Sequence, residues 1–232
     1  MSAHGHDRER PAWRERNRQR FGLLLATIVT AFAIQGVAQP GRWEQVLVSL
    51  LLAATLLLAL SAAEARPAVM RAALAICVAV VVLSVIEAAN GTVDNAATRL
   101  ASALVVLLAP AAIVVGVLRG VRATHSITME AVLGTLCVYL LIGMFFASIF
   151  GAIDRIDGPF FVQGGPATVS RCLYFSFTTL ATLGYGDYTA RSNLGHTLSV
   201  FEALLGQLYL VTVVAVIVSN LGRGPVRERE RR

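Results

Sequence analysis

The chain has 232 residues, of which 56% are hydrophobic and only 15% are charged, and its formal net charge is +6. A soluble domain normally carries about one quarter charged residues, so this composition excludes an ordinary soluble protein. Long segments carry no charge, and the short segments between them carry nearly all of it, as in a protein that crosses a membrane several times. Every basic residue is an arginine at a terminus or in a short loop, which favours a topology signal over nucleic-acid binding.

Six apolar stretches are long enough to cross a bilayer core of about 30 Å as helices. The sequence therefore predicts an all-α membrane protein with transmembrane helices at residues 21–39, 44–62, 71–89, 98–118, 128–153 and 196–221. The first stretch is longer than the apolar core of a signal peptide, which has about 7–15 residues, so we expect it to remain as a helix. Cys77, Cys137 and Cys172 form no C-x-x-C pair and are expected to be small buried apolar residues.

The arginines predict the orientation of these helices. Fifteen fall on the side of the two termini and five on the other side, so both termini are expected to be cytoplasmic. The predicted organisation is a basic tail (1–20), a four-helix membrane bundle (21–126), a second membrane domain (127–222) and a second basic tail (223–232). The basic tails could bind anionic lipid head groups, or they could serve topology alone.

The outer segment between the fifth and sixth stretches has structure of its own. Residues 167–181 contain no glycine or proline and predict a helix that is too short to span the membrane. Non-helical backbone at membrane depth is tolerated only when it is buried in protein or lines a water-filled cavity. A short re-entrant helix, followed by an extended return through "TLGYGD" (182–187), satisfies this rule.

The return segment is suited to binding a cation through its backbone. Carbonyl groups can replace the water shell of a cation if consecutive residues turn them the same way. That arrangement requires alternating backbone conformations, which most L-residues resist and glycine accepts. Gly184 and Gly186, on either side of Tyr185, are therefore expected to be essential to its shape.

"TLGYGD" resembles the signature selectivity filter of tetrameric potassium channels, and the resemblance extends over residues 128–222 as outer helix, pore helix, filter and inner helix. It implies a potassium-selective channel that conducts K+ passively, that is not an enzyme, and that has no cofactor other than K+ in the filter. The residues that it implies for K+ coordination are Thr182, Leu183, Gly184, Tyr185 and Gly186. One filter segment per chain is one quarter of a ring, so the resemblance also implies a homotetramer, with the lipid bilayer and K+ as its other partners.

The same resemblance implies roles for residues around the filter. Asp187 would lie at the outer mouth, and the residues expected to support the filter are Tyr174, Phe175, Thr178 and Thr179. Gly206 would be a gating hinge, or it could instead allow close helix packing. Cavity-facing positions would be Gln207, Leu210 and Val214. Glu202 is an acid inside a span, and therefore a candidate functional residue that could bond the pore helix or the back of the filter, or be protonated.

The first four helices differ from a voltage sensor. Voltage-gated relatives carry arginine at every third position of the fourth helix, whereas this stretch has none between Arg99 and Arg119. Since one charge crossing the field contributes about 2.3 kcal/mol per 100 mV, we expect little or no voltage sensing. The bundle is expected to be a lipid-facing scaffold or a sensor of lipid, tension or a small ligand.

Three other functions agree less well with the sequence than a potassium channel. A non-selective cation channel would normally break the G-Y-G pattern, and a potassium transporter subunit would carry four degenerate filter loops in one longer chain. A non-conducting scaffold would have no reason to keep the threonine, both glycines and the aspartate together. The absence of lysine suggests a GC-rich bacterial genome, and so a multi-pass protein of the plasma membrane.

Overall fold

The computed structural model describes residues 9–37, 42–62, 65–90, 104–109, 112–114 and 129–221. These residues are almost entirely helical, as the sequence predicts, and an isolated antiparallel bridge joins Phe161 to Ala190. The helices are α1 (Glu9–Val37), α2 (Arg42–Ala62), α3 (Pro67–Asn90), α5 (Met129–Asp157), α6 (Val169–Leu180) and α7 (Asn193–Leu221). Residues 104–109 and 112–114 are also helical, and the rest of the predicted fourth helix lies outside the described residues.

Most helices extend beyond the apolar stretches that predict them. The largest difference is in α1, which begins at Glu9, inside the segment that the sequence assigns to the basic tail (1–20). Arginine, glutamate and glutamine are good helix formers, and Pro11 falls in the first turn, where its missing N–H breaks no helical hydrogen bond. Pro67 opens α3 for the same reason. Hydropathy therefore locates the membrane part of a helix but not its polar ends.

Three of the described helices are long and apolar enough to cross a membrane: Pro67–Asn90, Val132–Asp157 and Asn193–Val213. Shorter apolar helices cover Phe21–Val37, Val46–Ser61 and Leu104–Val114. These three helices fall within the first, second and fourth predicted spans, respectively. The protein is therefore an all-helical protein with at least three membrane-capable helices.

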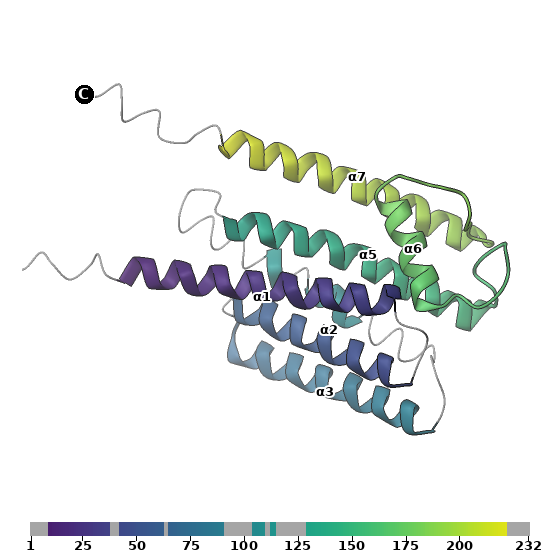
Figure 1. Cartoon of the computed structure of the whole chain (residues 1–232), viewed down its shortest axis with the longest axis horizontal. Helices are drawn as coiled ribbons and strands as arrows, with labels where there is room; N and C mark the ends of the chain where they lie inside the picture. Colours follow the sequence, from purple (N-terminus) through teal and green to yellow (C-terminus); the bar gives the residue numbers. More distant parts are fainter. Residues whose placement is uncertain are drawn as a thin grey trace, which may run out of the picture.

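The long helices lie side by side, and α6 lies at one end of them (Figure 1). The start of α1, the start of α5 and the end of α7 are at the opposite end from α6 and the irregular segment around it. α1 packs against α2, α5 and α6, and α3 packs against α2. This arrangement places both ends of the described chain at one end of the molecule and residues 158–192 at the other.

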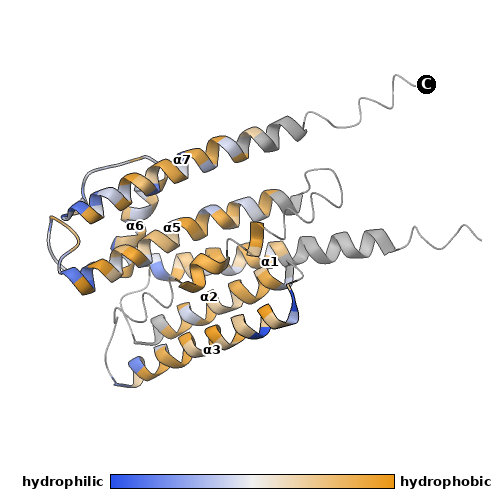
Figure 2. Ribbon diagram, turned by 180° about the vertical axis from the view of Figure 1, so that it is seen from behind, coloured by the Kyte–Doolittle hydropathy of each residue, from blue (hydrophilic) through white to orange (hydrophobic). Residues whose placement is uncertain are grey.

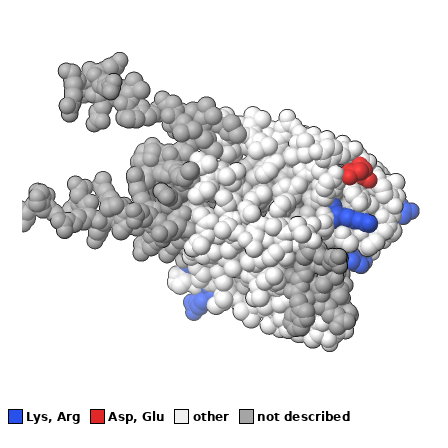
Figure 3. Space-filling model, in the orientation of Figure 1, with Lys and Arg blue, Asp and Glu red and all other residues white. Residues whose placement is uncertain are grey.

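The helices are apolar along most of their length, with hydrophilic residues near their ends (Figure 2). In the space-filling view, the charged side chains on the visible face lie toward its two ends, and a broad belt without charge separates them (Figure 3). A belt of this kind suits contact with lipid. The uncharged stretches of the sequence therefore form the uncharged belt, and the charged residues between them lie toward its two sides.

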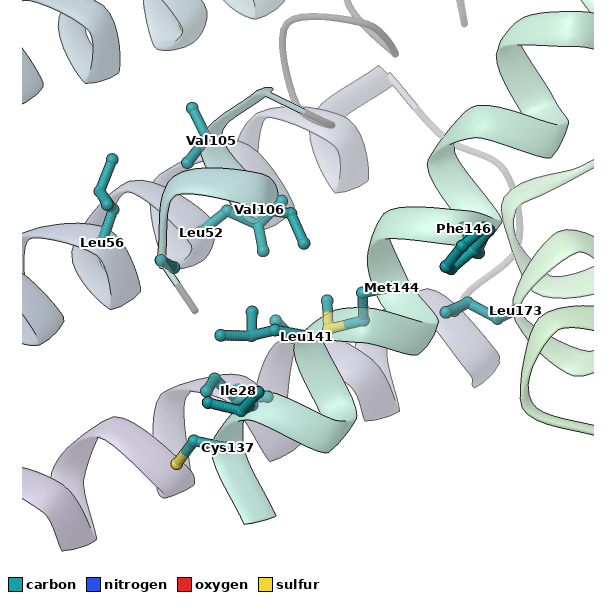
Figure 4. Packing of buried hydrophobic residues seen from close by; sticks show 14 of the residues in the cluster. Ile28, Leu52, Leu56, Val105, Val106, Cys137, Leu141, Met144, Phe146 and Leu173 are labelled. Carbon is teal, nitrogen blue, oxygen red and sulfur yellow. The ribbon is translucent and has the colours of Figure 1, made fainter. Parts of the chain in front are cut away.

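One buried cluster joins the N-terminal helices to α5. Its side chains come from α1, α2, residues 104–109 and α5 (Figure 4), and include Ile28, Leu52, Leu56, Val105, Val106, Cys137, Leu141 and Met144. Cys77, Cys137 and Cys172 are all buried, which confirms the prediction that they are small core residues. The N-terminal helices are therefore packed onto the rest of the chain and do not form a separate unit.

α1 also reaches the short helix α6. The rings of Phe32 and Phe177 meet edge to face, with their centroids 4.8 Å apart. The Ser170 hydroxyl donates to the Gly36 carbonyl at 3.0 Å. The tip of the Phe177 ring packs on Gly143 of α5, where a Cβ atom would lie only 2.6 Å from Cζ. Phe177 is thus held between α1 and α5, and α6 is positioned by both.

Candidate functional site

The short helix α6 has a defined start and a defined end. Thr168 caps its N-terminus, because its hydroxyl accepts a hydrogen bond from the Arg171 backbone N–H at 3.3 Å. At the other end, the backbone N–H groups of residues 181–184 bond back to the last turns of the helix. Thr178 contributes most to this end, because its carbonyl accepts from Leu183 at 2.8 Å and from Gly184 at 3.2 Å. The predicted helix at 167–181 is confirmed with bounds one or two residues shorter.

Residues 182–186 leave α6 with backbone conformations that alternate in hand. Thr182, Gly184 and Gly186 have φ angles of 56°, 53° and 78°, whereas Leu183 and Tyr185 between them do not have positive φ. An ordinary strand turns successive carbonyl groups to opposite sides, but an alternation of left- and right-handed residues brings them to one side. The segment can therefore present a row of carbonyl oxygens to a ligand. The left-handed conformation expected of Gly184 and Gly186 is present.

Thr182 is the residue of this segment that the sequence does not explain. A threonine with positive φ is strained, because its branched Cβ crowds the backbone. It is the only non-glycine residue in the described part of the chain with this conformation. Its N–H donates to the Thr179 carbonyl at 2.9 Å, and the neighbouring bonds to Thr178 fix the turn around it. The end of α6 thus imposes the conformation, and the strain is concentrated at the start of the segment.

Aromatic side chains surround the outer part of the segment. The rings of Tyr174 and Tyr185 stack with centroids 6.4 Å apart, and Tyr174 also meets Tyr188 edge to face. A side-chain hydrogen bond with Asp187 raises the pKa of Tyr174 above its ordinary value, since the phenol proton is shared with a carboxylate. Phe175 points the other way and is buried in a cluster with Phe150, Phe160 and Phe161. Tyr174 therefore contacts the return segment directly, and Phe175 contacts it only through the packing of α6.

The remaining predicted support residues make local contacts. The Thr178 hydroxyl donates to the Phe175 carbonyl at 3.0 Å and does not bond to Asp187. Asp187 is exposed, and one of its carboxylate oxygens accepts from the Tyr188 N–H at 3.1 Å. Thr179 contributes its carbonyl to the turn at Thr182. Backbone groups of α6, and not threonine hydroxyls, therefore hold the return segment.

Gly206 of α7 lies against the end of α6. A Cβ atom at this position would be 2.5 Å from the Leu180 carbonyl oxygen, so no other residue fits without a shift of the backbone. Close packing, one of the two roles expected for Gly206, therefore explains why this position is glycine. Gln207 and Leu210 are exposed on the same helix, and the side chain of Val214 lies outside the described residues.

Glu202 lies one turn before Gly206 and is completely buried. Its Oε1 atom is 2.5 Å from the Ser176 hydroxyl of α6, and that hydroxyl is also 2.7 Å from the Gly143 carbonyl of α5. A single polar contact therefore ties α5, α6 and α7 together. Of the roles considered for Glu202, the bond to the short helix is confirmed.

Sequence reasoning missed Ser176, Gly143 and Phe177. Serine, glycine and phenylalanine are common in membrane helices, and these three are important because each contacts a neighbouring helix. The signal that could have drawn attention to them is a small or polar residue within an otherwise apolar helix, because such residues mark helix contacts in membrane proteins.

The region that contains α5, α6, the return segment and α7 resembles a known protein family. Residues 134–223 match the sequence model of a family described as "Ion channel". This match supports an ion-channel domain in this part of the chain. The match includes most of α5, all of α6, the return segment and α7, so it covers the residues described above. No curated protein and no solved structure matched the chain.

Proposed function

We propose that the chain forms a potassium-selective channel in which the carbonyl groups of residues 182–185, with the Thr182 hydroxyl, coordinate dehydrated K+. The alternating hand of the backbone carries this proposal, since it provides the row of oxygens that replaces the water shell of the ion. Position adds support, because the segment begins at the C-terminal end of α6, where the helix dipole favours a cation. Conduction is passive and needs no chemical step and no cofactor.

The pore itself requires four copies of the chain. One copy leaves large apolar groups bare around the segment, with 58% of Leu183 and 67% of Tyr185 exposed. One face of α7 is equally bare, with exposed Phe201, Leu204, Leu208 and Val211. Four-fold assembly would cover these side chains and bring four rows of carbonyls onto one axis. Gln207, Leu210 and Val214 would then line the cavity below the filter, and Gly206 would be the point at which α7 bends.

The remaining parts of the proposal concern the membrane. In this proposal both termini lie in the cytoplasm, the filter opens to the outside, and the membrane is the plasma membrane. The N-terminal helices act as a scaffold on α5 and α6, without voltage sensing, since the sequence offers no arginine ladder. Anionic lipids are the proposed partners of the basic residues at the two ends of the chain.

Ion flux from liposomes that contain the purified protein tests the proposal. A potassium gradient should drive much faster flux than a sodium gradient, with little change at an imposed voltage. Equal potassium and sodium flux would contradict selectivity and favour a non-selective cation channel. If neither ion moves, barium binding and potassium-dependent thermal stabilisation distinguish a closed pore from one without a filter, because a bound ion stabilises the folded state.

A further inference from the structure

The contact between Glu202, Ser176 and Gly143 requires a proton in addition to the one on the serine hydroxyl. The Ser176 oxygen lies 2.7 Å from the Gly143 carbonyl oxygen and 2.5 Å from Glu202 Oε1. A serine hydroxyl has one proton and can donate only one hydrogen bond. The Gly143 carbonyl has none to give. Three oxygen atoms in a row therefore need two protons, and the serine supplies one.

An ionised Glu202 cannot complete this arrangement. If Ser176 donated to a carboxylate, its oxygen would face the Gly143 carbonyl oxygen at 2.7 Å with no proton between them. If Ser176 donated to Gly143, its lone pairs would face a negative oxygen of Glu202. A protonated carboxyl group removes both conflicts, since its O–H donates to Ser176 and Ser176 donates to Gly143.

The rest of the carboxyl group leads to the same conclusion. Glu202 is 0% exposed, and its Oε2 atom is buried without a hydrogen-bond partner. Burying an unpartnered carbonyl oxygen of a neutral acid costs a few kcal/mol of folding free energy at most. Burying an unpartnered oxygen of an ionised carboxylate costs far more. The side chain forms no ion pair with a basic residue of the described chain.

The surroundings of Glu202 contain few groups that could alter its charge. The titratable side chains on the helices around it are Tyr139 and Cys137 of α5, Cys172 and Tyr174 of α6, and Tyr209 and His196 of α7. Tyr139 is the one that interacts with it electrostatically. The other charged residues of these helices whose side chains the structure describes lie toward the outer ends, at Asp154, Arg155, Asp157 and Arg171. None of these supplies a positive charge to a buried carboxylate.

We propose that Glu202 is a neutral carboxylic acid that positions the pore helix by donating its proton to Ser176, which in turn donates to the Gly143 carbonyl. The two bonds join α7, α6 and α5 one turn from Gly206, where α7 already touches the last carbonyl of α6. Loss of the proton would leave only the serine proton for the two contacts, so one of the two bonds would be lost and a buried charge would remain beside the base of the return segment. The protonation state follows from the contact itself, and its effect on ion flux rests on the proposed channel function.

Infrared difference spectroscopy of the full-length protein tests the protonation state directly. The wild type minus Glu202→Gln spectrum at neutral pH should contain the C=O band of a protonated carboxyl group. Asp157→Asn provides the matched control, because Asp157 is exposed and its difference spectrum should contain carboxylate bands only. A carboxylate band in the Glu202 difference spectrum would overturn the proposal, whatever ions the protein conducts.

The positioning role predicts a pH profile that a merely structural side chain would not give. The folded state holds a proton that the unfolded chain releases above the ordinary carboxyl range, so folding stability falls as pH rises. The melting temperature of the wild type, measured against that of Glu202→Gln, should therefore fall as the pH rises from about 4.3, where an ordinary glutamate titrates, to about 8–9, where documented buried glutamates titrate. Glutamine keeps a donor for Ser176 and has no proton to lose, so its own profile should be flat by comparison.

Flux supplies the second readout and separates this proposal from the channel proposal. Raising the pH should reduce potassium flux in the wild type and in Asp157→Asn but not in Glu202→Gln. Identical pH profiles of flux in all three proteins would contradict the positioning role. Absence of flux in every protein would count against the channel function alone, because the infrared band and the melting profile would still decide the state of Glu202.

Discussion

The α2–α3 pair and the α5–α6–α7 unit are both apolar helical assemblies, but they are held together differently. α2 and α3 meet through apolar side chains, the Ser49–Ser84 bond at 2.8 Å and a long contact from the Cys77 thiol to the Ala53 carbonyl at 3.9 Å. The second unit is crossed by polar bonds between helices, including Ser176 to Gly143 and the Tyr209 hydroxyl to the Thr135 carbonyl at 2.6 Å. Asp154 of α5 also holds the segment that leads to α6, since its carboxylate accepts from the N–H groups of Phe160 and Ala167.

This difference indicates that the α5–α6–α7 unit requires a more exact geometry than the α2–α3 pair. In lipid there is little hydrophobic force between helices, so apolar contacts alone define a packing without making it unique. Polar bonds and closely packed glycines specify distances, and they gather around the segment whose backbone is strained. We therefore expect the α5–α6–α7 unit to be intolerant of small changes and the α2–α3 pair to be tolerant of them.

The largest effect is expected from Gly184→Ala and Gly186→Ala. Both glycines have positive φ, and a left-handed non-glycine residue costs about 1–2 kcal/mol. Relief of that strain would turn a carbonyl out of the row. A difference of this size lowers the population of the intact row about 5- to 30-fold, and ion flux should fall by a similar factor. Liposome flux measures the loss.

Gly158→Ala is the matched control for this experiment. Gly158 has a φ of 85° and open space around it, so alanine brings the same strain outside the return segment. Its flux should stay at the wild-type level. Equal losses at Gly158 and Gly184 would mean that strain in general, and not the carbonyl row, limits conduction.

Gly206→Ala should have the next largest effect. The added methyl group would meet the Leu180 carbonyl, and overpacking of this kind costs about 1–3 kcal/mol. The melting temperature of the assembled protein should fall, and flux should fall with it. Gly22→Ala adds the same methyl group to α1 where nothing lies within 4 Å, so it should not destabilise the protein. A stable, conducting Gly206→Ala would show that α6 and α7 are less tightly packed than described.

Phe32→Ala tests whether the two regions are coupled. Phe32 belongs to α1 but contacts Phe177 of α6, and an aromatic pair contributes about 0.5–1.5 kcal/mol beyond its buried area. The variant should lower the melting temperature and also alter potassium flux. Val78→Ala, on the exposed face of α3, should change neither. If both variants leave flux unchanged, the N-terminal helices do not influence the filter.

Ser49→Ala should have the smallest effect. Ser84 already donates to the Val80 carbonyl, so Ser49 is the donor in the Ser49–Ser84 bond. Hydrogen bonds between membrane helices contribute about 0.6 kcal/mol on average. A small decrease in melting temperature with unchanged flux is expected. A loss as large as that of Ser176→Ala, measured in parallel, would remove the distinction between the two regions.

Much of the second unit follows from the sequence, and the reasons are local. The apolar stretches at 128–153 and 196–221 predict α5 and α7, and the absence of glycine and proline after Thr168 predicts α6. Gly184 and Gly186 are recognisable because few other residues accept their conformation. These features depend on residues that are neighbours in the chain.

The features that the sequence did not reveal depend on contacts between distant residues. Nothing in the type of Thr182 predicts a φ of 56°, which the end of α6 imposes. Phe177 is one apolar residue among many until Phe32 and Gly143 enclose it. Glu202 was noticed because it is an acid in a span, but its proton becomes apparent only from the two oxygens around Ser176.

Ion positions in the assembled protein test the central claim most directly. Crystals grown in potassium and soaked with thallium or rubidium would give anomalous peaks wherever the ion binds. The account predicts a tetramer with peaks on its four-fold axis, each surrounded by carbonyl oxygens of residues 182–185, and no such peaks when sodium alone is present. A tetramer whose carbonyls at 182–185 face away from the axis, or an assembly without an axial ion in potassium, would contradict it.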